Sequence, residues 1–512
     1  MKHFRVTNDK KREFDDMRRY VIRRSENGAD GCIDEMTWRD LVMDEVFKKI
    51  DYTSSTAGEY VFYDMLRRPV FDNETLYDRQ EKIKKFENDE IIKQKVVKVL
   101  RKAGKTDMDV ANILYSDMEY EKKFHWICKG LYLALIVMMI LMAVIKSSVF
   151  MFAFGILLMA NMALHYNLKM KMVGRVEAVQ YLGRLVNCSE ELARVFDSID
   201  SNTAKELRSI KKECKKLGKR SRNVSLVEGL DVLGDYLTII FLIKERSFFD
   251  SVREVEKNKE HLQRLFRIFG EVDTFVAVSE YRESIEKYCK PVFREESKYL
   301  KLRGIAHPLI DNPISNDISV SGHSVLITGS NMSGKSTFVR MVGVNALLAQ
   351  TIMTCICDSY EASFFKIVTS ISPQDDLMGG KSYYMSEAES IKRIVDTSGD
   401  KITTLALIDE IFRGTNPIER VNAAAEILDY VDARNGLVMV ATHDLELTKM
   451  VKNYDFYYFM DDVDDEGLAF DYTIRPGISP TRNAVKVLKL LGYPDELLDR
   501  IEKQLETKTL AV

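Results

Sequence analysis

Two uncharged apolar runs stand out in a chain whose other segments mix polar and apolar positions. Residues 130–145 carry no charge, and after Lys146 the next formally charged residue is Lys169. Each run is slightly shorter than the roughly 20 residues that a perpendicular membrane span needs, but the neutral residues 147–168 lengthen the second run. The pattern predicts a transmembrane hairpin of two helices over residues 126–168, with a turn at residues 146–148.

Positive charge flanks both ends of this hairpin. The flanking cations are Lys122, Lys123 and Lys129 before the first apolar run, and Lys169, Lys171 and Arg175 after the second. Because positive flanks stay on the cytoplasmic side, we expect a multi-pass protein of the cell membrane with both large flanks in the cytoplasm. The alternative is a buried hairpin in a soluble protein, which normally shows a polar face over this length.

Helical periodicity dominates residues 27–103 and again residues 173–299. Within the second block, residues 205–222 hold nine Lys or Arg and two Glu. We expect a solvated helix face there, and contact with the phosphates of DNA or of anionic lipid is the alternative. The apolar run 232–243 contains Asp235 and is too short to span a membrane, so it is predicted as core.

The pattern changes after Gly304. Short apolar runs at residues 324–328, 404–408 and 437–441 alternate with helical stretches. This alternation is typical of a mainly parallel α/β domain.

Composition adds three limits. A chain of 512 residues with 46% hydrophobic and 30% charged residues is expected to fold into more than one domain. The net charge of -3 provides no global basic field, so a nucleic acid would have to bind a local patch. The seven cysteines stand singly except Cys355 and Cys357, which lack a second pair or histidines at zinc spacing, so a reduced intracellular environment is expected.

The strongest chemical motif follows the apolar run 325–328. It has the pattern G-x-x-x-x-G-K-S and is followed by a helical stretch to about residue 350. Glycines let backbone N–H groups wrap a phosphate, and the helix N-terminus adds positive potential. We expect Lys335 to reach the β- and γ-phosphates of ATP and Ser336 to ligate Mg²⁺. The predicted nucleotide-binding residues here are Gly329, Ser330, Asn331, Met332, Ser333, Gly334, Lys335, Ser336 and Thr337.

Acidic residues follow a second apolar run. Residues 405–408 end in Asp409 and Glu410, at the strand end that faces the ligand crevice of an open α/β sheet. Asp409 is predicted as a magnesium ligand, and Glu410 as the catalytic carboxylate that polarises the attacking water. The run 437–441 leads to His443, which is predicted to sense the γ-phosphate.

Together these motifs resemble the ATPase domain of the MutS family in order and spacing. The resemblance rests on residues 329–336, 375–387, 409–415 and 441–443, with His307-Pro308 ahead of them and residues 476–500 behind. It implies an ABC-type dimer in which Ser382 of one subunit completes the ATP site of the other. It also implies mismatch repair-related DNA binding.

Weaker matches to the lever domain of this family occur at residues 53–58, 66–69 and 270–273. The expected fold is therefore an α/β ABC-type P-loop ATPase domain at the C-terminus, preceded by an all-α lever domain that the hairpin interrupts. The predicted domains are residues 1–125 (helical lever), 126–168 (hairpin), 169–303 (helical lever or clamp) and 304–512 (ATPase with a helical dimerisation segment).

The chain departs from the family pattern in several places. Phe412 stands where the family usually has glycine, and residues 312–314 stand where it has an adenine-stacking aromatic. We find no N-terminal mismatch-reading domain with a Phe-x-Glu wedge, and no nuclease module. Two functions therefore remain open: a membrane-anchored, dimeric ATPase that binds DNA, or a membrane-anchored ATP-driven switch that acts on a protein partner without DNA.

Overall fold

The structure is a computed structural model with two compact units. It describes residues 14–26, 31–116, 121–145, 147–172, 174–220, 236, 239–330, 333–371, 383–412, 416–464, 467–478, 493–494, 496–498 and 500–501. The first unit comprises Met1–Asp30, Asp51–Asp64 and Lys82–Tyr281, and the second comprises Gly31–Ile50, Met65–Glu81 and Arg282–Val512. Two segments of the predicted N-terminal domain therefore fold with the C-terminal part of the chain.

Helices build the described part of the first unit. They are α1 (Phe14–Glu26), α4 (Thr56–Leu66), α6 (Glu90–Ala103), α7 (Val110–Tyr115), α8 (Glu121–Ile145), α9 (Ser148–Met172), α10 (Arg175–Phe196), α11 (Ser201–Glu213), α14 (Ile243–Lys257) and α15 (Lys259–Ser284). Helix α5 (Asn73–Asn88) crosses the unit boundary near its middle, and α4 and α15 cross it in their last residues. Helix α10 packs against both α6 and α11. The helical pattern that the sequence predicts over residues 27–103 is confirmed.

Helices α4 and α15 approach each other through two glycines. A Cβ atom on Gly270 would lie 2.5 Å from the carbonyl oxygen of Ala57 and still closer to Val61, and a Cβ atom on Gly58 would lie 2.8 Å from the Cβ of Asp273. Asp273 is buried, and its burial raises the pKa of the carboxyl to about 7. The residues 53–58 and 270–273 that resemble the family's lever thus meet in one helix crossing.

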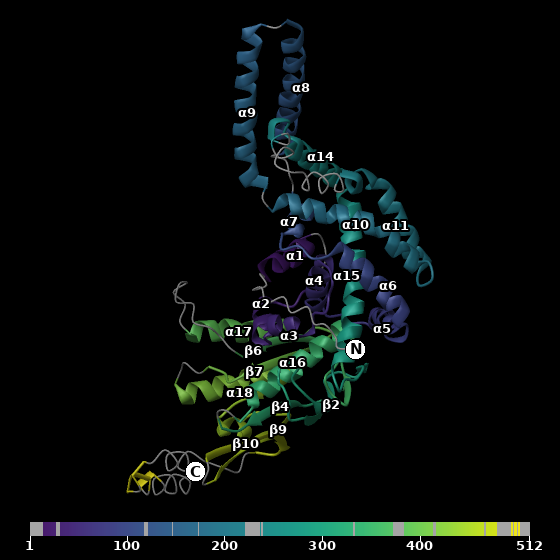
Figure 1. The fold of residues 1–512 in the computed structure, drawn as a ribbon. Helices are drawn as coiled ribbons and strands as arrows, with labels where there is room; N and C mark the ends of the chain where they lie inside the picture. Colours follow the sequence, from purple (N-terminus) through teal and green to yellow (C-terminus); the bar gives the residue numbers. More distant parts are fainter. Residues whose placement is uncertain are drawn as a thin grey trace. The chain divides into compact units, whose positions relative to one another are not determined.

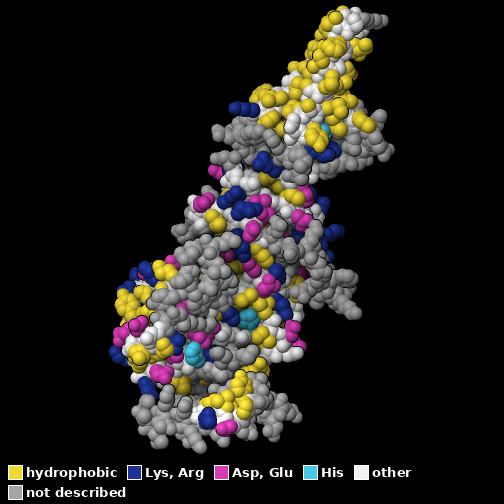
Figure 2. Space-filling view, turned by 90° about the vertical axis from the view of Figure 1, so that its left-hand side faces the viewer, with side chains coloured by type: hydrophobic (Ala, Val, Ile, Leu, Met, Phe, Trp, Pro, Cys, Tyr) yellow, Lys and Arg dark blue, Asp and Glu magenta, His cyan; other side chains and the backbone are white. Residues whose placement is uncertain are grey.

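Helices α8 and α9 pack side by side as a hairpin (Figure 1). Within them, Lys123–Ile145 and Ser148–Lys169 are long and apolar enough to cross a membrane, and only 11% and 6% of their most apolar stretches are buried. Hydrophobic side chains cover the visible face of this hairpin in Figure 2. A helix pair in the core of a soluble protein would have this surface covered.

A six-stranded sheet forms the centre of the second unit (Figure 1). Its order is β10 (Gly467–Pro476), β9 (Tyr454–Asp464), β4 (Ser324–Thr328), β8 (Gly436–Ala441), β7 (Thr403–Asp409) and β6 (Phe365–Ser370). Only the pairing of β10 with β9 is antiparallel. The three strands that the sequence predicts are therefore confirmed as neighbours in one mainly parallel sheet.

Helices cover both faces of this sheet. On one face, Leu407 of β7 lies against Gly343 of α16 (Lys335–Ile352), where an added Cβ would lie 2.5 Å from the leucine. On the other face, Ala406 and Ile408 belong to a core cluster with residues of α17 (Tyr383–Thr397) and α18 (Pro417–Ala433). Burial on both faces explains why β7 is a continuous apolar run.

A smaller sheet accompanies the large one in the same unit. Its order is β1 (Val292–Phe293), β5 (Ser359–Ala362), β2 (Tyr299–Ile305) and β3 (Asn316–Ser321). The helical pattern predicted to residue 299 is wrong in its last part, because α15 ends at Ser284. Pro291 cannot continue a helix, and the backbone of Cys289 pairs with Cys355 instead. Half of the predicted core run 232–243 lies outside the described residues; in the described half Leu242 is buried, whereas Tyr236 and Ile243 are exposed, so the core prediction holds there only in part.

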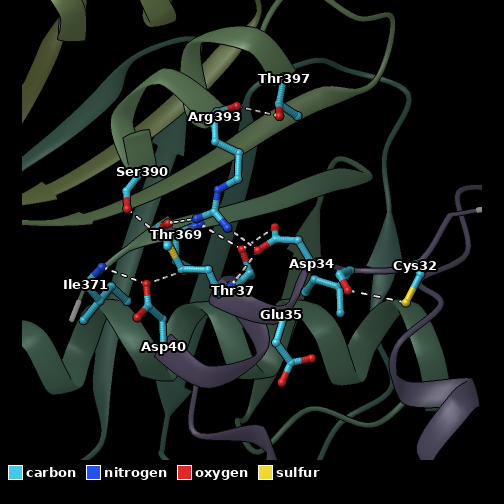
Figure 3. A network of polar contacts seen from close by, with 12 residues as sticks. Cys32, Asp34, Glu35, Thr37, Asp40, Thr369, Ile371, Ser390, Arg393 and Thr397 are labelled. Carbon is cyan, nitrogen blue, oxygen red and sulfur yellow. Dashed lines mark hydrogen bonds and ion pairs between the residues drawn. The ribbon is translucent and has the colours of Figure 1, made fainter. Parts of the chain in front are cut away.

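The segment 31–50 is fixed to the large sheet by a polar network (Figure 3). It contains α2 (Glu35–Asp40) and α3 (Met43–Ile50). The buried carboxylate of Asp40 accepts hydrogen bonds from Thr369 Oγ1 at 2.7 Å and from the Ile371 N–H at 2.9 Å. Arg393 of α17 pairs with Asp34 and donates to the Thr369 carbonyl. These bonds attach α2 to the end of β6.

The glycine crossing generates a stability prediction. Gly270→Ala should destabilise the protein by about 1–3 kcal/mol, because the new methyl group overpacks the contact with Ala57 and Val61. Thermal unfolding of the detergent-solubilised protein, followed by circular dichroism, measures the effect. Gly130→Ala is the matched control, since a Cβ there meets nothing within 4 Å. Equal melting temperatures for the two variants would show that the helices do not cross as described.

Candidate functional site

Three parallel strands end at the same level of the large sheet. Ile327 of β4 pairs with Ala441 of β8, and Ala441 pairs with Asp409 of β7. The alignment continues one residue further, because the Thr442 N–H donates to the Ile327 carbonyl at 2.9 Å and the Glu410 N–H donates to the Ala441 carbonyl at 2.8 Å. The glycine-rich loop, the acid pair and His443 therefore leave the sheet along one edge.

The loop after β4 has a conformation that favours glycine at two points. Gly329 has a φ of +145° and Gly334 a φ of +105°. A Cβ on Gly329 would lie 2.9 Å from the carbonyl oxygen of Phe459, so a side chain there would collide with the backbone of β9. Lys335 is buried, and its ammonium group donates to the carbonyls of Gly329 at 2.8 Å and Ser330 at 2.6 Å.

Helix α16 begins directly at this loop. Lys335 is its first residue, so Ser336 and Thr337 lie in the first turn. The first N–H groups of a helix have no partner within the helix, and they favour a bound anion. The hydroxyl of Ser333 donates to the Ser330 carbonyl at 2.9 Å and closes the loop. This geometry is a cradle for a phosphate group.

The acid pair is the next part of the site. Asp409 is buried at the end of β7, and Glu410 follows it with a φ of +58°. Glu410 Oε1 lies 3.2 Å from His443 Nδ1, and this hydrogen bond raises the pKa of the histidine. Asp444 lies 3.7 Å from His443 Nε2 and is itself bonded to Arg420 at 2.8 Å. The structure thus brings together the two residues that the sequence predicts as catalytic.

Phe412, which stands where the family usually has glycine, adopts a backbone conformation that favours glycine. Its φ is +58°, a backbone conformation that glycine adopts with much less strain. Its side chain is buried in the same core cluster as Ile408 and Ile411. A glycine at this position would remove the backbone strain but make no side-chain contacts, whereas the Phe412 ring packs in the apolar core.

A pocket of about 330 Å³ lies beside the loop, next to Gly334 and Thr337. Its other lining residues include His307, Pro313, Ile314, Phe338, Phe459 and Tyr472. Burial and the nearby Arg340 lower the pKa of His307 to about 4, so this ring is neutral at physiological pH. Sequence reasoning assigned no role here to Phe459 or Tyr472, since both follow the loop by more than 120 residues.

Some predicted site residues lie outside the described residues. These are Asn331 and Met332 of the loop, Ser382, and residues 413–415 after Phe412.

The basic run is described up to Arg220. Lys205, Lys212, Lys215, Lys216 and Lys219 are exposed. Other cations of the run are paired within the first unit, because Arg208 bonds to Asp197, Lys211 to Glu190 and Arg220 to Glu254. Buried positions at 204, 207, 210, 214 and 217 alternate with them at helical spacing. The run therefore has the amphipathic pattern of a solvated helix face, which leaves five lysines exposed.

The site geometry agrees with what comparison with known proteins finds. The sequence model described as MutS domain V matches residues 325–508, a stretch that begins in β4 and includes the acid pair and His443. DNA mismatch repair protein MutS from a Thermotoga species is 32% identical over 275 residues, and the protein of that name from Thermus thermophilus is 32% identical over 266 residues. Residues 325–508 of the chain therefore belong to the MutS family. MutS domain V is the ATPase domain of MutS proteins.

The match is partial on both sides. It covers 51% of this chain and 34% of the Thermotoga protein, and 50% and 32% in the comparison with Thermus thermophilus. The chain therefore spans about a third of the length of the curated relatives it matches.

The contact between Glu410 and His443 generates a prediction for pH titration. The pKa of His443 should exceed 6.5, because the carboxylate stabilises the imidazolium. The stabilisation is full below pH 6.5 and is lost as the pH rises through the raised pKa. The protein has only seven histidines, so NMR of ¹³C-histidine with His443→Gln as the assignment variant can follow this ring.

The matched comparison uses two glutamates. Glu410→Gln should lower the pKa of His443, whereas Glu419→Gln, an exposed position in the first turn of α18, should leave it unchanged. The same titration curve for His443 in both variants would contradict the contact.

Proposed function

We propose that this chain is an ATP hydrolase that works with Mg²⁺. The observation that carries the proposal is the common edge formed by β4, β7 and β8, where the glycine-rich loop, the acid pair with its buried Asp409, and His443 meet. Membership of residues 325–508 in the MutS family, through its ATPase domain, supports the same activity.

The loop residues divide the work of binding ATP. The backbone N–H groups of residues 329–336 wrap the phosphates, and Lys335 neutralises the β- and γ-phosphates. In the described state the ammonium group of Lys335 bonds to the carbonyls of Gly329 and Ser330, so phosphate oxygens would exchange with these acceptors. The residues present also fit a magnesium ion, because a hydroxyl and a buried carboxylate are oxygen donors that this ion prefers.

Magnesium, held by Ser336 and Asp409, would supply positive charge beside the phosphates. Glu410 accepts a proton from the attacking water. His443 orients the Glu410 carboxylate through the 3.2 Å contact, and its Nε2, which lies 3.7 Å from Asp444, would turn to the γ-phosphate when ATP binds. The two roles are compatible because the His443 side chain is half-exposed at the sheet edge.

The pocket beside Gly334 is the proposed place of the adenine base. The family's stacking aromatic is replaced by residues 312–314, of which Pro313 and Ile314 line this pocket. Tyr472 lies on the pocket with an exposed ring and offers an aromatic surface in its place. The neutral His307 adds a hydrogen-bonding group.

We further propose that the ATPase acts as a homodimer. By family resemblance, Ser382 of the partner subunit completes the ATP site of each protomer. Residues 476–500, which resemble the family's dimerisation segment, take that role in this proposal.

DNA is the proposed partner of the dimer, in a process related to mismatch repair. The names of the relatives and the five exposed lysines of the basic run support this. The second candidate is an ATP-driven switch that acts on a protein partner, and the pairing of Arg208, Lys211 and Arg220 with acidic side chains favours it. DNA retention that weakens steeply with salt separates the two functions.

The hairpin is the proposed membrane anchor. Its two helices have the length and the exposed apolar surface that a bilayer requires. Lysines and arginines outside both ends keep the remaining chain in the cytoplasm, where ATP is present.

The ATPase proposal predicts distinct defects for two substitutions. Glu410→Gln should retain ATP but lower kcat by about 10²–10⁴-fold, because it removes only the proton acceptor. Lys335→Ala should weaken ATP binding itself. Equilibrium binding of a fluorescent ATP analogue and steady-state phosphate release measure the two effects, with Glu419→Gln as the control. Turnover at the wild-type rate in Glu410→Gln would refute the assigned role.

The anchor proposal predicts a topology. An epitope tag inserted after Ser147, in the turn between α8 and α9, should lie outside the cytoplasm. The matched control is a tag after Ser198, in the exposed turn between α10 and α11, which should lie inside. Protease accessibility in intact cells measures both. Equal protection of the two tags, with the protein in the soluble fraction, would refute the anchor.

A further inference from the structure

Three cysteines from distant parts of the sequence meet in the second unit. Cys355 and Cys357 lie between α16 and β5, and Cys289 lies between α15 and β1. The three sulfur atoms all lie within 4.8 Å of one another, and those of Cys289 and Cys357 are 3.2 Å apart. The sequence alone gave no sign of this cluster, because the nearest partner of the C-x-C pair is 66 residues upstream of it.

The backbone explains why these side chains converge. Cys289 and Cys355 form an antiparallel bridge with both hydrogen bonds present, at 2.8 and 3.0 Å. Residues opposite each other in such a bridge point to the same face. The chain bends after Cys355, and this brings the sulfur of Cys357 to 3.2 Å from that of Cys289.

The surroundings of the cluster are rigid and partly closed. Cys355 and Cys357 are buried, while Cys289 is partly exposed and provides a path for entry. The neighbouring end of α16 is fixed by the buried Arg282, which donates to the carbonyls of Ile352 at 3.0 Å and Met353 at 2.8 Å. The backbone N–H of Tyr360 donates a hydrogen bond to the Cys289 sulfur. Hydrogen bonds to sulfur are a common feature of sites where metals bind thiolates.

We propose that Cys289, Cys355 and Cys357 bind a thiophilic d¹⁰ metal ion, Zn²⁺ or Cu⁺. A metal–sulfur distance of about 2.3 Å places three thiolates about 3.8–4.0 Å apart. The sulfur–sulfur distances in the structure run from 3.2 Å to at most 4.8 Å, on both sides of this value. Movements of the sulfur atoms by less than about 1 Å would therefore give the metal-binding geometry. Binding releases the three thiol protons to solvent, and no electron is transferred.

A disulfide accounts for the cluster less well. It would use only two of the three sulfurs and would not account for the convergence of the third. It would also require an oxidant, whereas a reducing cytoplasm keeps thiols free. Three thiolates alone satisfy Cu⁺ in a trigonal site, while Zn²⁺ takes a fourth ligand, for which water can enter beside the partly exposed Cys289.

The test uses the full chain in detergent, purified under reductant and stripped with a chelator. Titration with Zn²⁺, or with Cu⁺ under anaerobic conditions, should yield one tightly bound ion per chain by elemental analysis. Either ion should also raise the melting temperature and protect three thiols from alkylation. Preference for one ion in competition identifies the native metal. Both readouts are independent of ATP turnover.

Three variants and one control make the result decisive. Cys289→Ser, Cys355→Ser and Cys357→Ser should each weaken binding at least tenfold, while Cys32→Ser, which removes an exposed thiol outside the cluster, should bind as the wild type does. If a buried serine unfolds the protein, Cys289→Ala serves at the partly exposed position. Equal binding in all variants, no binding of either ion, or a disulfide between any two of these cysteines in the freshly purified reduced protein would overturn the proposal.

Discussion

Every chemical group of the proposed ATP site depends on the parallel alignment of β4, β8 and β7. Ile327, Ala441 and Asp409 lie level across these three strands, and the hydrogen bonds from Thr442 and Glu410 extend the alignment beyond the sheet. A shift of one residue in β7 would turn its side chains to the opposite faces. Leu407 would then leave α16, and Asp409 would move away from the loop. The register is therefore specified twice, by the apolar packing on both faces and by the backbone bonds at the edge.

Backbone strain gathers around the same edge. Glu410, Phe412 and Tyr472 have φ values of +58°, +58° and +51°, and none of them is glycine. Such conformations cost on the order of 1–3 kcal/mol each and persist only where the surroundings impose them. At Glu410 the strand bond to Ala441 does this, and at Phe412 the core cluster does. In return, the Glu410 carboxylate meets His443, and Tyr472 lies on the pocket.

Features of the fold that depend on neighbouring residues in the sequence could be predicted, whereas features that depend on contacts between distant residues could not. The strands β4, β7 and β8 were confirmed because their signals lie within a few consecutive residues. The helix end at Ser284 was missed although Pro291 limits the helix locally, and the pairing of Cys289 with Cys355 that follows the helix has no signal in the sequence. The pocket residue Tyr472 and the contact of Asp40 with Thr369 could not be predicted either. Their partners are separated by more than 100 residues, and no periodic pattern reports which distant side chains meet.

The contact between Asp40 and Thr369 also has a consequence for the order of synthesis. The two residues are 329 positions apart, so at about 5–20 residues per second the ribosome needs roughly 15 to 65 s to make the second after the first. Helices α8 and α9 emerge within this interval. Helix α2 therefore waits for its sheet while this helical hairpin is being made, and the Asp40 carboxylate stays hydrated until Thr369 has been synthesised.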